Sequence, residues 1–431
     1  MEVNKRTAIH LRATVLATAL TGLVTGWASA QTVNLTLSHF NNPNEVATAN
    51  KLIEVFEAAN PDINIDVELI PTGGDGDNLV KTRLSTGDMT DLLWYNAGSL
   101  FHALNPKERF VDLTDEPYQA SILDSFKSVV TEDGRVYGVP IGTAFGGGVL
   151  YNRKVFEKLG LTVPKTWAEF MANNEKLKAA GIPAVIQTFG TPWTAQLFML
   201  GDYYNLQAAE PDFAERYTAN QAKYATAPAL KGFERQEEVF KAGYLNEDFA
   251  SAIFEDGLRM VAEGEGAQYP MLSITVGTIA TTYPDLVNDV GFFALPGDDA
   301  TKNGLTTWMP NGLYITSTTP HLAEAKRFVE FVASTAGCDA QTAAIGATGP
   351  YLVKGCTIPA DVPPVVSDLL PYFETDGATA PALEFLSPVK GPNLPQITVE
   401  VGSGIRSAAD GAALYDEDVK KQAQQLALPG W

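Results

Sequence analysis

The chain has 431 residues, of which 45% are hydrophobic and 19% charged, and its formal net charge at pH 7 is −21. This length and composition allow sizeable hydrophobic cores and exclude a disordered or low-complexity protein. The excess of carboxylates excludes nucleic acid and anionic lipid as partners, because binding to either depends on Lys and Arg side chains that neutralise phosphates.

The first thirty residues have the pattern of a secretory signal peptide. Three basic residues precede an apolar run at 13–27, and Ala28, Ser29 and Ala30 form the small-residue site that signal peptidase cuts. The run is shorter than the about twenty residues that a membrane-spanning helix needs. No cysteine lies near the cut to carry a lipid. We therefore expect a protein that is secreted to the periplasm, is not inserted in a membrane and begins at Gln31.

Removal of this leader takes away three basic residues and one acid, which leaves 401 residues with 27 basic and 50 acidic side chains. The length suggests two or more domains, since an ordinary domain has about 150 residues. A charge this negative keeps a protein soluble and its copies apart, so we expect a monomer.

The segment after the leader alternates between strand and helix patterns. Residues 33–37 alternate apolar and polar side chains, which predicts a strand. Asn44 can cap a helix whose apolar face extends to Phe56. Residues 63–69 alternate again. A strand, a helix and a second strand within about forty residues form a βαβ unit and predict a parallel sheet.

The same kind of pattern recurs along the chain and predicts an α/β fold. The further expected elements are a helix at 76–84, strands at 92–95, 136–141 and 149–151, a helix that a capping box of Thr166 and Glu169 begins and Gly181 ends, and a helix at 322–332.

Three consecutive glycines, at 146–148, precede the strand at 149–151. A glycine-rich loop can hold phosphate, but no Lys-Ser or Lys-Thr pair follows and no Gly-x-Gly-x-x-Gly pattern is present. We instead interpret residues 142–148 as a flexible crossing between two lobes.

The chain has two cysteines, Cys338 and Cys356. In an oxidising compartment this spacing predicts a disulfide that closes a short loop. Zinc is disfavoured, because two cysteines and the three histidines beyond the leader supply few ligands. We expect no metal and no other cofactor.

Five short motifs occur in a fixed order. They are Ser-Thr-Gly-Asp-Met-Thr-Asp at 85–91, Asp-Gly-Arg-Val-Tyr-Gly-Val-Pro at 133–140, Leu-Tyr-Asn-Arg-Lys-Val-Phe at 150–156, Val-Pro-Lys-Thr-Trp-Ala-Glu-Phe at 163–170, and Asn-Gly-Leu-Tyr-Ile at 311–315 with the helix pattern after it. This order resembles the family 1 extracellular solute-binding proteins of bacterial ABC importers, which include the maltose-binding proteins. Thr90 departs from the proline that is usual there.

The resemblance implies a two-lobed periplasmic binding protein fold of type II, in which a hinge closes the lobes around a ligand. It implies three crossings between the lobes, near 142–147, 308–311 and 346–350. The implied lobes are 31–143 with 309–348, and 144–308 with 349–431. It also implies capture of a short or modified sugar, delivery to the membrane permease subunits of an importer, and no enzymatic activity.

Five candidate ligand residues follow from chain position. Phe40 and Asn41 follow the first strand and Asn96 follows the strand at 92–95, and open α/β sheets bind ligands at the carboxyl ends of strands. Asp75 follows the second strand, and the first crossing carries Thr143. We interpret His39 as a structural histidine and Trp94 as a core residue.

The other candidates combine position with the resemblance. A sugar needs aromatic rings against its C–H faces and polar side chains around its hydroxyls. Trp193 stands where relatives carry an aromatic residue, Trp308 and Asn311 flank the second crossing, and Phe145 is on the first. Met271 stands near the place of a stacking tryptophan of the family, which weakens the case for a long maltodextrin-like ligand.

Three alternatives stay open. A polyamine could bind to the same fold if carboxylates gathered between the lobes. A sensor that signals to a receptor instead of an importer has the same sequence features. A periplasmic glycosidase is the least favoured, since no nucleophile elbow or zinc motif is present and candidate acid pairs prove nothing in so acidic a chain.

Overall fold

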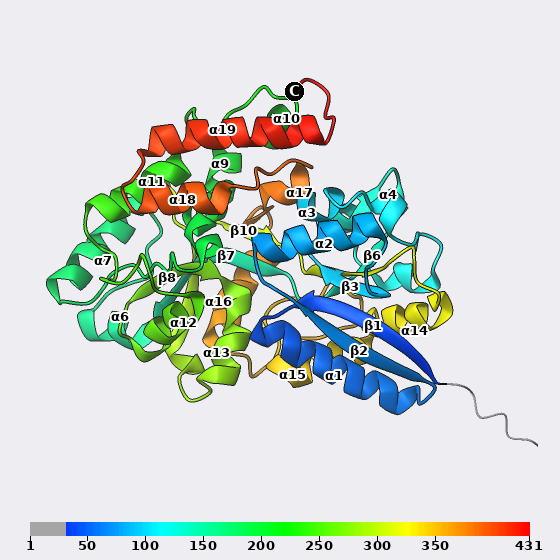
Figure 1. Cartoon of the computed structure of the whole chain (residues 1–431). Helices are drawn as coiled ribbons and strands as arrows, with labels where there is room; N and C mark the ends of the chain where they lie inside the picture. The colour runs from blue at the N-terminus through cyan, green and yellow to red at the C-terminus, as the bar shows by residue number, and fades with distance from the viewer. Residues whose placement is uncertain (1–31) are drawn as a thin grey trace, which may run out of the picture.

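A computed structural model describes residues 32–431, so the predicted leader lies outside the described part of the chain. Two helix-covered β-sheets form two lobes (Figure 1). The first-lobe sheet consists, in spatial order, of β2 (Ile63–Ile70), β1 (Val33–Phe40), β3 (Leu92–Tyr95), β11 (Asn311–Ile315) and β6 (Gly138–Ile141). The second consists of β12 (Thr379–Pro381), β10 (Leu305–Trp308), β7 (Phe145–Asn152) and β8 (Gln268–Leu272), with β9 (Val290–Ala294) also on β7. The predicted α/β class is confirmed.

Helices cover both sheets, and among residues 32–431 none is both long enough and apolar enough to cross a membrane. The first lobe carries α1 (Pro43–Ala59), α2 (Gly74–Thr86), α3 (Ser99–His102), α4 (Pro106–Arg109), α5 (Asp124–Lys127), α14 (Leu322–Val332) and α15 (Thr335–Ile345). The second carries α6 (Arg153–Leu159), α7 (Trp167–Ala179), α8 (Leu197–Gly201), α9 (Tyr203–Ala209), α10 (Phe213–Thr218), α11 (Lys231–Lys241), α12 (Phe254–Glu263), α13 (Val276–Thr282), α16 (Pro364–Glu374), α17 (Leu383–Leu386), α18 (Leu394–Gly402) and α19 (Ala408–Gln425).

The predicted βαβ unit at the start of the first lobe is formed by β1, α1 and β2, and β1 pairs in parallel with both β2 and β3. The start of α1 differs from the prediction. Asn42, not Asn44, caps the helix, because its side chain accepts a hydrogen bond from the amide of Glu45 at 3.0 Å. Pro43 then occupies the first helical position, where its missing N–H costs nothing.

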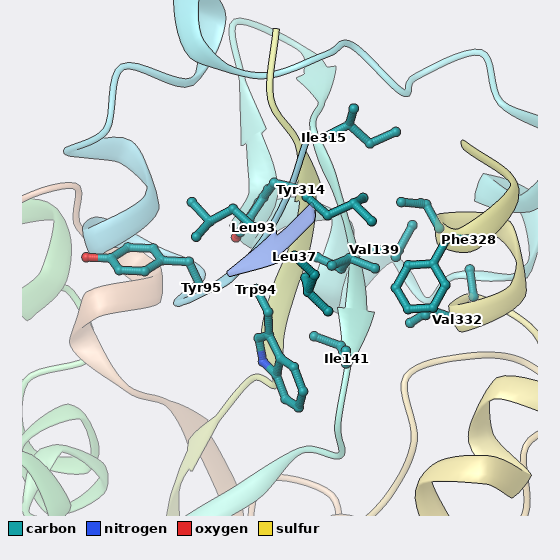
Figure 2. Packing of buried hydrophobic residues seen from close by; sticks show 14 of the residues in the cluster. Leu37, Leu93, Trp94, Tyr95, Val139, Ile141, Tyr314, Ile315, Phe328 and Val332 are labelled. Carbon is teal, nitrogen blue, oxygen red and sulfur yellow. The ribbon is translucent and has the colours of Figure 1, made fainter. Parts of the chain in front are cut away.

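The first-lobe core joins residues of its sheet to residues of α1, α2, α14 and the segment 101–137. Figure 2 shows side chains from β1, β3, β6 and β11 gathered with Phe328 and Val332 of the helix. Trp94 is buried in this core, as expected. His39 is buried as well, and its Nδ1 lies 2.9 Å from the carbonyl oxygen of Phe40, which confirms a structural histidine.

The interpretation of the glycine run as a flexible crossing is wrong. Gly146, Gly147 and Gly148 all lie within β7 and are buried. A Cβ added at Gly147 would lie 2.3 Å from Cζ3 of the Trp308 ring, and one at Gly148 would lie 2.3 Å from the carbonyl oxygen of Phe293. The glycines therefore allow close packing on a strand instead of flexibility.

Two connections join the sheets directly. Residues 142–144 link β6 of the first sheet to β7 of the second, and residues 309–310 link β10 of the second to β11 of the first. The first connection also forms a bridge between Thr143 and Tyr351. The predicted lobe boundaries after residues 143 and 308 fall within these two connections.

The predicted third boundary, between 348 and 349, is placed too early. Leu352 packs in the first-lobe core, and Val353 forms a bridge with Ile122 of the same lobe. Ile358 is the next residue that packs against a second-lobe core. The chain thus passes the hinge and returns to the first lobe before it reaches the second.

The predicted disulfide between Cys338 and Cys356 is confirmed. It ties α15 to the segment that precedes the passage to the second lobe, and Tyr351 and Val353 pack against it.

We expect the double substitution of Cys338→Ser and Cys356→Ser to lower the melting temperature by several degrees. Closure of a loop of 18 residues stabilises a folded chain by about 3 kcal/mol, because it restricts the unfolded state. Calorimetry checks this. A reductant should lower the melting temperature of the parent protein and leave that of the variant unchanged; equal values for the two oxidised proteins would contradict the prediction.

Candidate functional site

Polar and aromatic side chains meet where β1 and β3 end, next to the second connection. The rings of Phe40 and Tyr95, the last residues of these strands, lie 5.6 Å apart. Asn311 begins β11, and its Nδ2 donates to Oε1 of Glu45 at 3.4 Å. The other carboxyl oxygen of Glu45 accepts from the amide of Phe40 at 2.9 Å. We call Phe40, Glu45, Tyr95 and Asn311 the first-lobe cluster.

Glu45 is the buried acid of this cluster. Burial raises its pKa to about 8, although hydrogen bonds from Asn42 and from the amide of Phe40 act in the opposite direction. Nδ1 of His39 lies 3.8 Å from its Oε2, and burial lowers the pKa of that histidine. Around neutral pH the pair is therefore mainly a neutral carboxylic acid beside a neutral imidazole, and a protonated carboxyl can both donate and accept a hydrogen bond.

An aromatic pair stands on the second-lobe side. The rings of Phe145 and Trp308 face each other at 6.4 Å with an interplanar angle of 10°, because the two residues are opposite each other in the β7–β10 pairing. Leu272, Ile274 and Phe385 pack around them. We call Phe145 and Trp308 the aromatic stack.

Trp308 is held at its indole nitrogen as well as by its ring. Its Nε1 donates to Glu384, whose other oxygen lies 3.0 Å from Nζ of Lys390. The C-terminal part of the chain thus fixes the orientation of the aromatic stack.

The lobes also touch each other beside these groups. The side chain of Asn44 makes hydrogen bonds to residues near the start of α13. On another side, the backbone of Gly98 lies against α17, where an added Cβ would be 2.6 Å from the carbonyl oxygen of Glu384 and 2.7 Å from Cδ1 of Phe385. Phe385 packs both on the first-lobe core and on the aromatic stack. The two groups thus lie between places where the lobes meet.

Not all predicted ligand residues lie in these groups. Phe40 and Asn311 belong to the first-lobe cluster and Phe145 and Trp308 to the aromatic stack. Asn96 follows Tyr95 directly and is half-buried. The hydroxyl of Thr143 is buried and bonds Thr348 at 2.7 Å, so this residue serves the connection between the lobes.

The remaining predicted residues belong to neither group. Asn41 and Asp75 are exposed, the latter in the first turn of α2. Trp193 is half-buried, with its ring 5.3 Å from that of Phe254 in the second lobe. Met271 is fully buried in a second-lobe core and has no surface to offer a ligand here. The neighbouring Leu272 packs against the aromatic stack instead, because side chains alternate between the two faces of a strand.

Sequence reasoning missed Glu45, Tyr95, Glu384 and Lys390. An acid in the first turn of a helix is ordinary, so nothing in the sequence signals that Glu45 is buried. Tyr95 reads as the end of an apolar run. Glu384 and Lys390 lie beyond the last motif that resembles the family, and only the tertiary fold brings them to Trp308.

Two cavities outside these groups lie in the second lobe. One of about 210 Å³ is lined by the buried ion pair of Arg235 and Asp202 among other residues, and one of about 200 Å³ by residues that include Asn152 and Lys158. Within residues 32–431, no three His, Cys, Asp or Glu side chains are grouped to hold a metal ion.

Comparisons with known proteins agree with this architecture. Residues 42–337 match the model of a family described as bacterial extracellular solute-binding protein. The multiple sugar-binding protein of Streptococcus mutans is 27% identical over 69% of this chain and 71% of its own length. The melibiose/raffinose/stachyose-binding protein MelE of Bacillus subtilis is 24% identical over 71% and 72%.

Solved structures share the fold. A chitin oligosaccharide binding protein superposes with a TM-score of 0.78 and 19% identity, over 91% of this chain and all of the other. The binding protein RafE in complex with raffinose gives 0.75 and 22%, over 92% of this chain and all of the other. The expected two-lobed fold is confirmed.

We expect the melting temperature of Glu45→Gln to rise relative to that of the parent protein as the pH goes from about 4.5 to about 8. Because the folded-state pKa is raised, the unfolded chain releases the proton of Glu45 in this window while the folded protein keeps it. The parent protein therefore loses stability there, and the variant does not. Melting temperatures of both proteins across pH 4–9 check this.

Glu54→Gln is the matched control, because Glu54 is an exposed acid on the same helix. Its melting temperature should differ from that of the parent by an amount that changes little with pH. His39 is present in all three proteins and acts in the opposite direction, because its lowered pKa costs stability as the pH falls below its ordinary pKa of 6.5. A constant difference between Glu45→Gln and the parent would contradict the prediction.

Proposed function

The chain belongs to the family of bacterial extracellular solute-binding proteins, and on this premise we propose that it captures a sugar between its lobes for an ABC importer. The single observation that carries the choice of a sugar is that the connection 309–310 has the aromatic stack at one end, at Trp308, and the first-lobe cluster at the other, at Asn311. Phe145, Trp308 and Glu45 are buried in the present arrangement of the lobes. When the lobes part, the stack can cover the C–H face of a ring, while the amide of Asn311 and the carboxyl of Glu45 can hydrogen-bond its hydroxyls. A short neutral or modified sugar fits this set.

The relatives support the same class of ligand. One is a multiple sugar-binding protein and another binds melibiose, raffinose or stachyose by its name. Solved structures of the same fold include complexes with raffinose and with stachyose. Proteins of one fold differ in ligand, so these names indicate a class and leave the individual sugar to experiment.

The charges between the lobes favour a neutral ligand over a polyamine. A polyamine needs unpaired carboxylates, and three acids at or beside the two groups are protonated, hydrogen-bonded or paired with a cation. Glu45 is largely protonated at neutral pH. Asp77 accepts a hydrogen bond from the hydroxyl of Tyr95 at 2.6 Å, and Glu384 is paired with Lys390.

We further propose that the protein is a periplasmic monomer that passes its sugar to the membrane permease subunits and catalyses no reaction. The signal-peptide pattern of residues 1–30 and the net charge of −21 support the first point. The relatives are binding proteins by name, which supports the last. A sensor that signals to a receptor stays the alternative, and a permease encoded beside the gene would decide between them.

We expect one or more neutral sugars to raise the melting temperature by several degrees. A ligand at a hundred to a thousand times its Kd adds roughly 2.7–4 kcal/mol to the folded state. Thermal unfolding with raffinose, stachyose, chitin oligosaccharides, galactose and spermidine checks this. A rise with spermidine alone would keep the fold and overturn the sugar.

We expect Asn311→Ala to weaken binding of the stabilising sugar about 10- to 100-fold. The loss of an amide leaves a buried hydroxyl unpaired, which costs about 1–3 kcal/mol. Isothermal titration calorimetry measures the change. Asn64→Ala on the edge strand β2 is the control, because its amide bonds only Asp66, at 3.4 Å, and should leave the affinity unchanged. Equal affinities for both variants would remove Asn311 from the site.

A further inference from the structure

The side chain of Asn44 connects the two lobes by two hydrogen bonds. Asn44 is the second residue of α1 in the first lobe. Its Nδ2 donates to the carbonyl oxygen of Ile274 at 3.2 Å, and its Oδ1 accepts from the hydroxyl of Thr278 at 2.9 Å. Both partners belong to the second lobe, where Thr278 is in α13 and Ile274 in the short 3₁₀ turn before it.

A glycine makes this approach possible. A Cβ added at Gly277 would lie 3.1 Å from Oδ1 of Asn44 and 3.2 Å from both Cδ1 of Ile345 and Cγ2 of Thr348. Helix α13 is therefore in close contact with α1 and with the end of α15. The surfaces fit each other in the present arrangement of the lobes, and an alanine at this position would require the three side-chain atoms to shift by a few tenths of an ångström.

Asn44 has no role of this kind within its own lobe. The cap of α1 is Asn42, which bonds the amide of Glu45. Among the hydrogen bonds of the described residues, the side chain of Asn44 takes part only in those to Ile274 and Thr278. It is half-buried, so water can replace both bonds when the lobes separate.

The contact lies beside the candidate site without depending on a ligand. Asn44 precedes Glu45 of the first-lobe cluster, and Ile274 packs against the aromatic stack. The two hydrogen bonds join protein to protein in the present arrangement of the lobes, so they do not require a ligand.

We propose that Asn44 is an interlobe latch, whose bonds to Ile274 and Thr278 favour the closed arrangement of the lobes in the absence of ligand. This goes beyond the proposed function and does not depend on which solute binds. Because the apparent affinity scales with the fraction of molecules in the binding-competent state, the latch changes the affinity for every ligand by the same factor.

Distance measurement between two spin labels tests the latch without a ligand. The only two cysteines are joined in the disulfide, so labels can be placed at Lys107→Cys in the first lobe and Lys241→Cys in the second, both exposed. One hydrogen bond changes an equilibrium about fivefold. We therefore expect Thr278→Val to raise the ratio of long to short distances about fivefold, and Asn44→Ala to raise it by at least as much.

Asn50→Ala is the matched control, an exposed asparagine on the same helix, and should give the parent distribution. In the Asn44→Ala background, Thr278→Val should change the ratio of long to short distances less than Thr278→Val does in the parent, since the bond between Asn44 and Thr278 is already lost. A parent protein that is uniformly open, or variants with the parent distribution, would overturn the latch. Neither result would bear on whether the protein binds a sugar, which the thermal-shift panel decides.

Discussion

The packing of Trp308 on Gly147 is the contact on which the arrangement of the lobes depends. A Cβ at residue 147 would lie 2.3 Å from the indole ring, so the ring of Trp308 can lie over β7 only because this position has no side chain. One connection between the lobes enters β7 and the other leaves β10, and the pairing places them next to each other. The hinge and the aromatic stack of Phe145 and Trp308 thus follow from one close approach of a ring to a backbone.

Segments with strong periodicity predict their helices and strands correctly. The prediction is wrong where one residue type is compatible with two different structures. The alternating residues at 33–37 and 63–69 and the apolar run at 92–95 predict strands, and the structure has strands at 33–40, 63–70 and 92–95. The glycines at 146–148 were misread, because a missing side chain permits both a flexible loop and tight packing. Whether these glycines form a flexible loop or a tightly packed strand depends on Trp308, which is far away along the chain. The local sequence pattern therefore cannot distinguish the two structures.

The site was predictable to the same limited extent. The sequence places Phe145, Trp308 and Asn311 beside the connections between the lobes, and they lie there in the structure; their contact with a ligand stays a prediction. The resemblance predicts a ligand contact at Met271. The residue that packs against the aromatic stack is its neighbour Leu272, because consecutive side chains of a strand point to opposite faces of the sheet. Glu45 has no signal in the sequence, since only the tertiary fold buries it against β1 and β11, and this burial raises its pKa.

The contacts between the lobes differ in kind, and the difference bears on how the molecule closes. At Gly98 the backbone meets α17 by van der Waals packing alone, whereas Asn44 makes directed hydrogen bonds. Packing of this kind is lost as soon as surfaces part, while hydrogen bonds at a half-buried residue can be exchanged for bonds to water at small net cost. A ligand can shift the balance only by the amount by which it prefers the closed state. On the proposed latch, the protein's own contacts contribute part of the free energy that favours closure. A ligand that bridges the aromatic stack and the first-lobe cluster then needs to supply only the remaining part of this free energy.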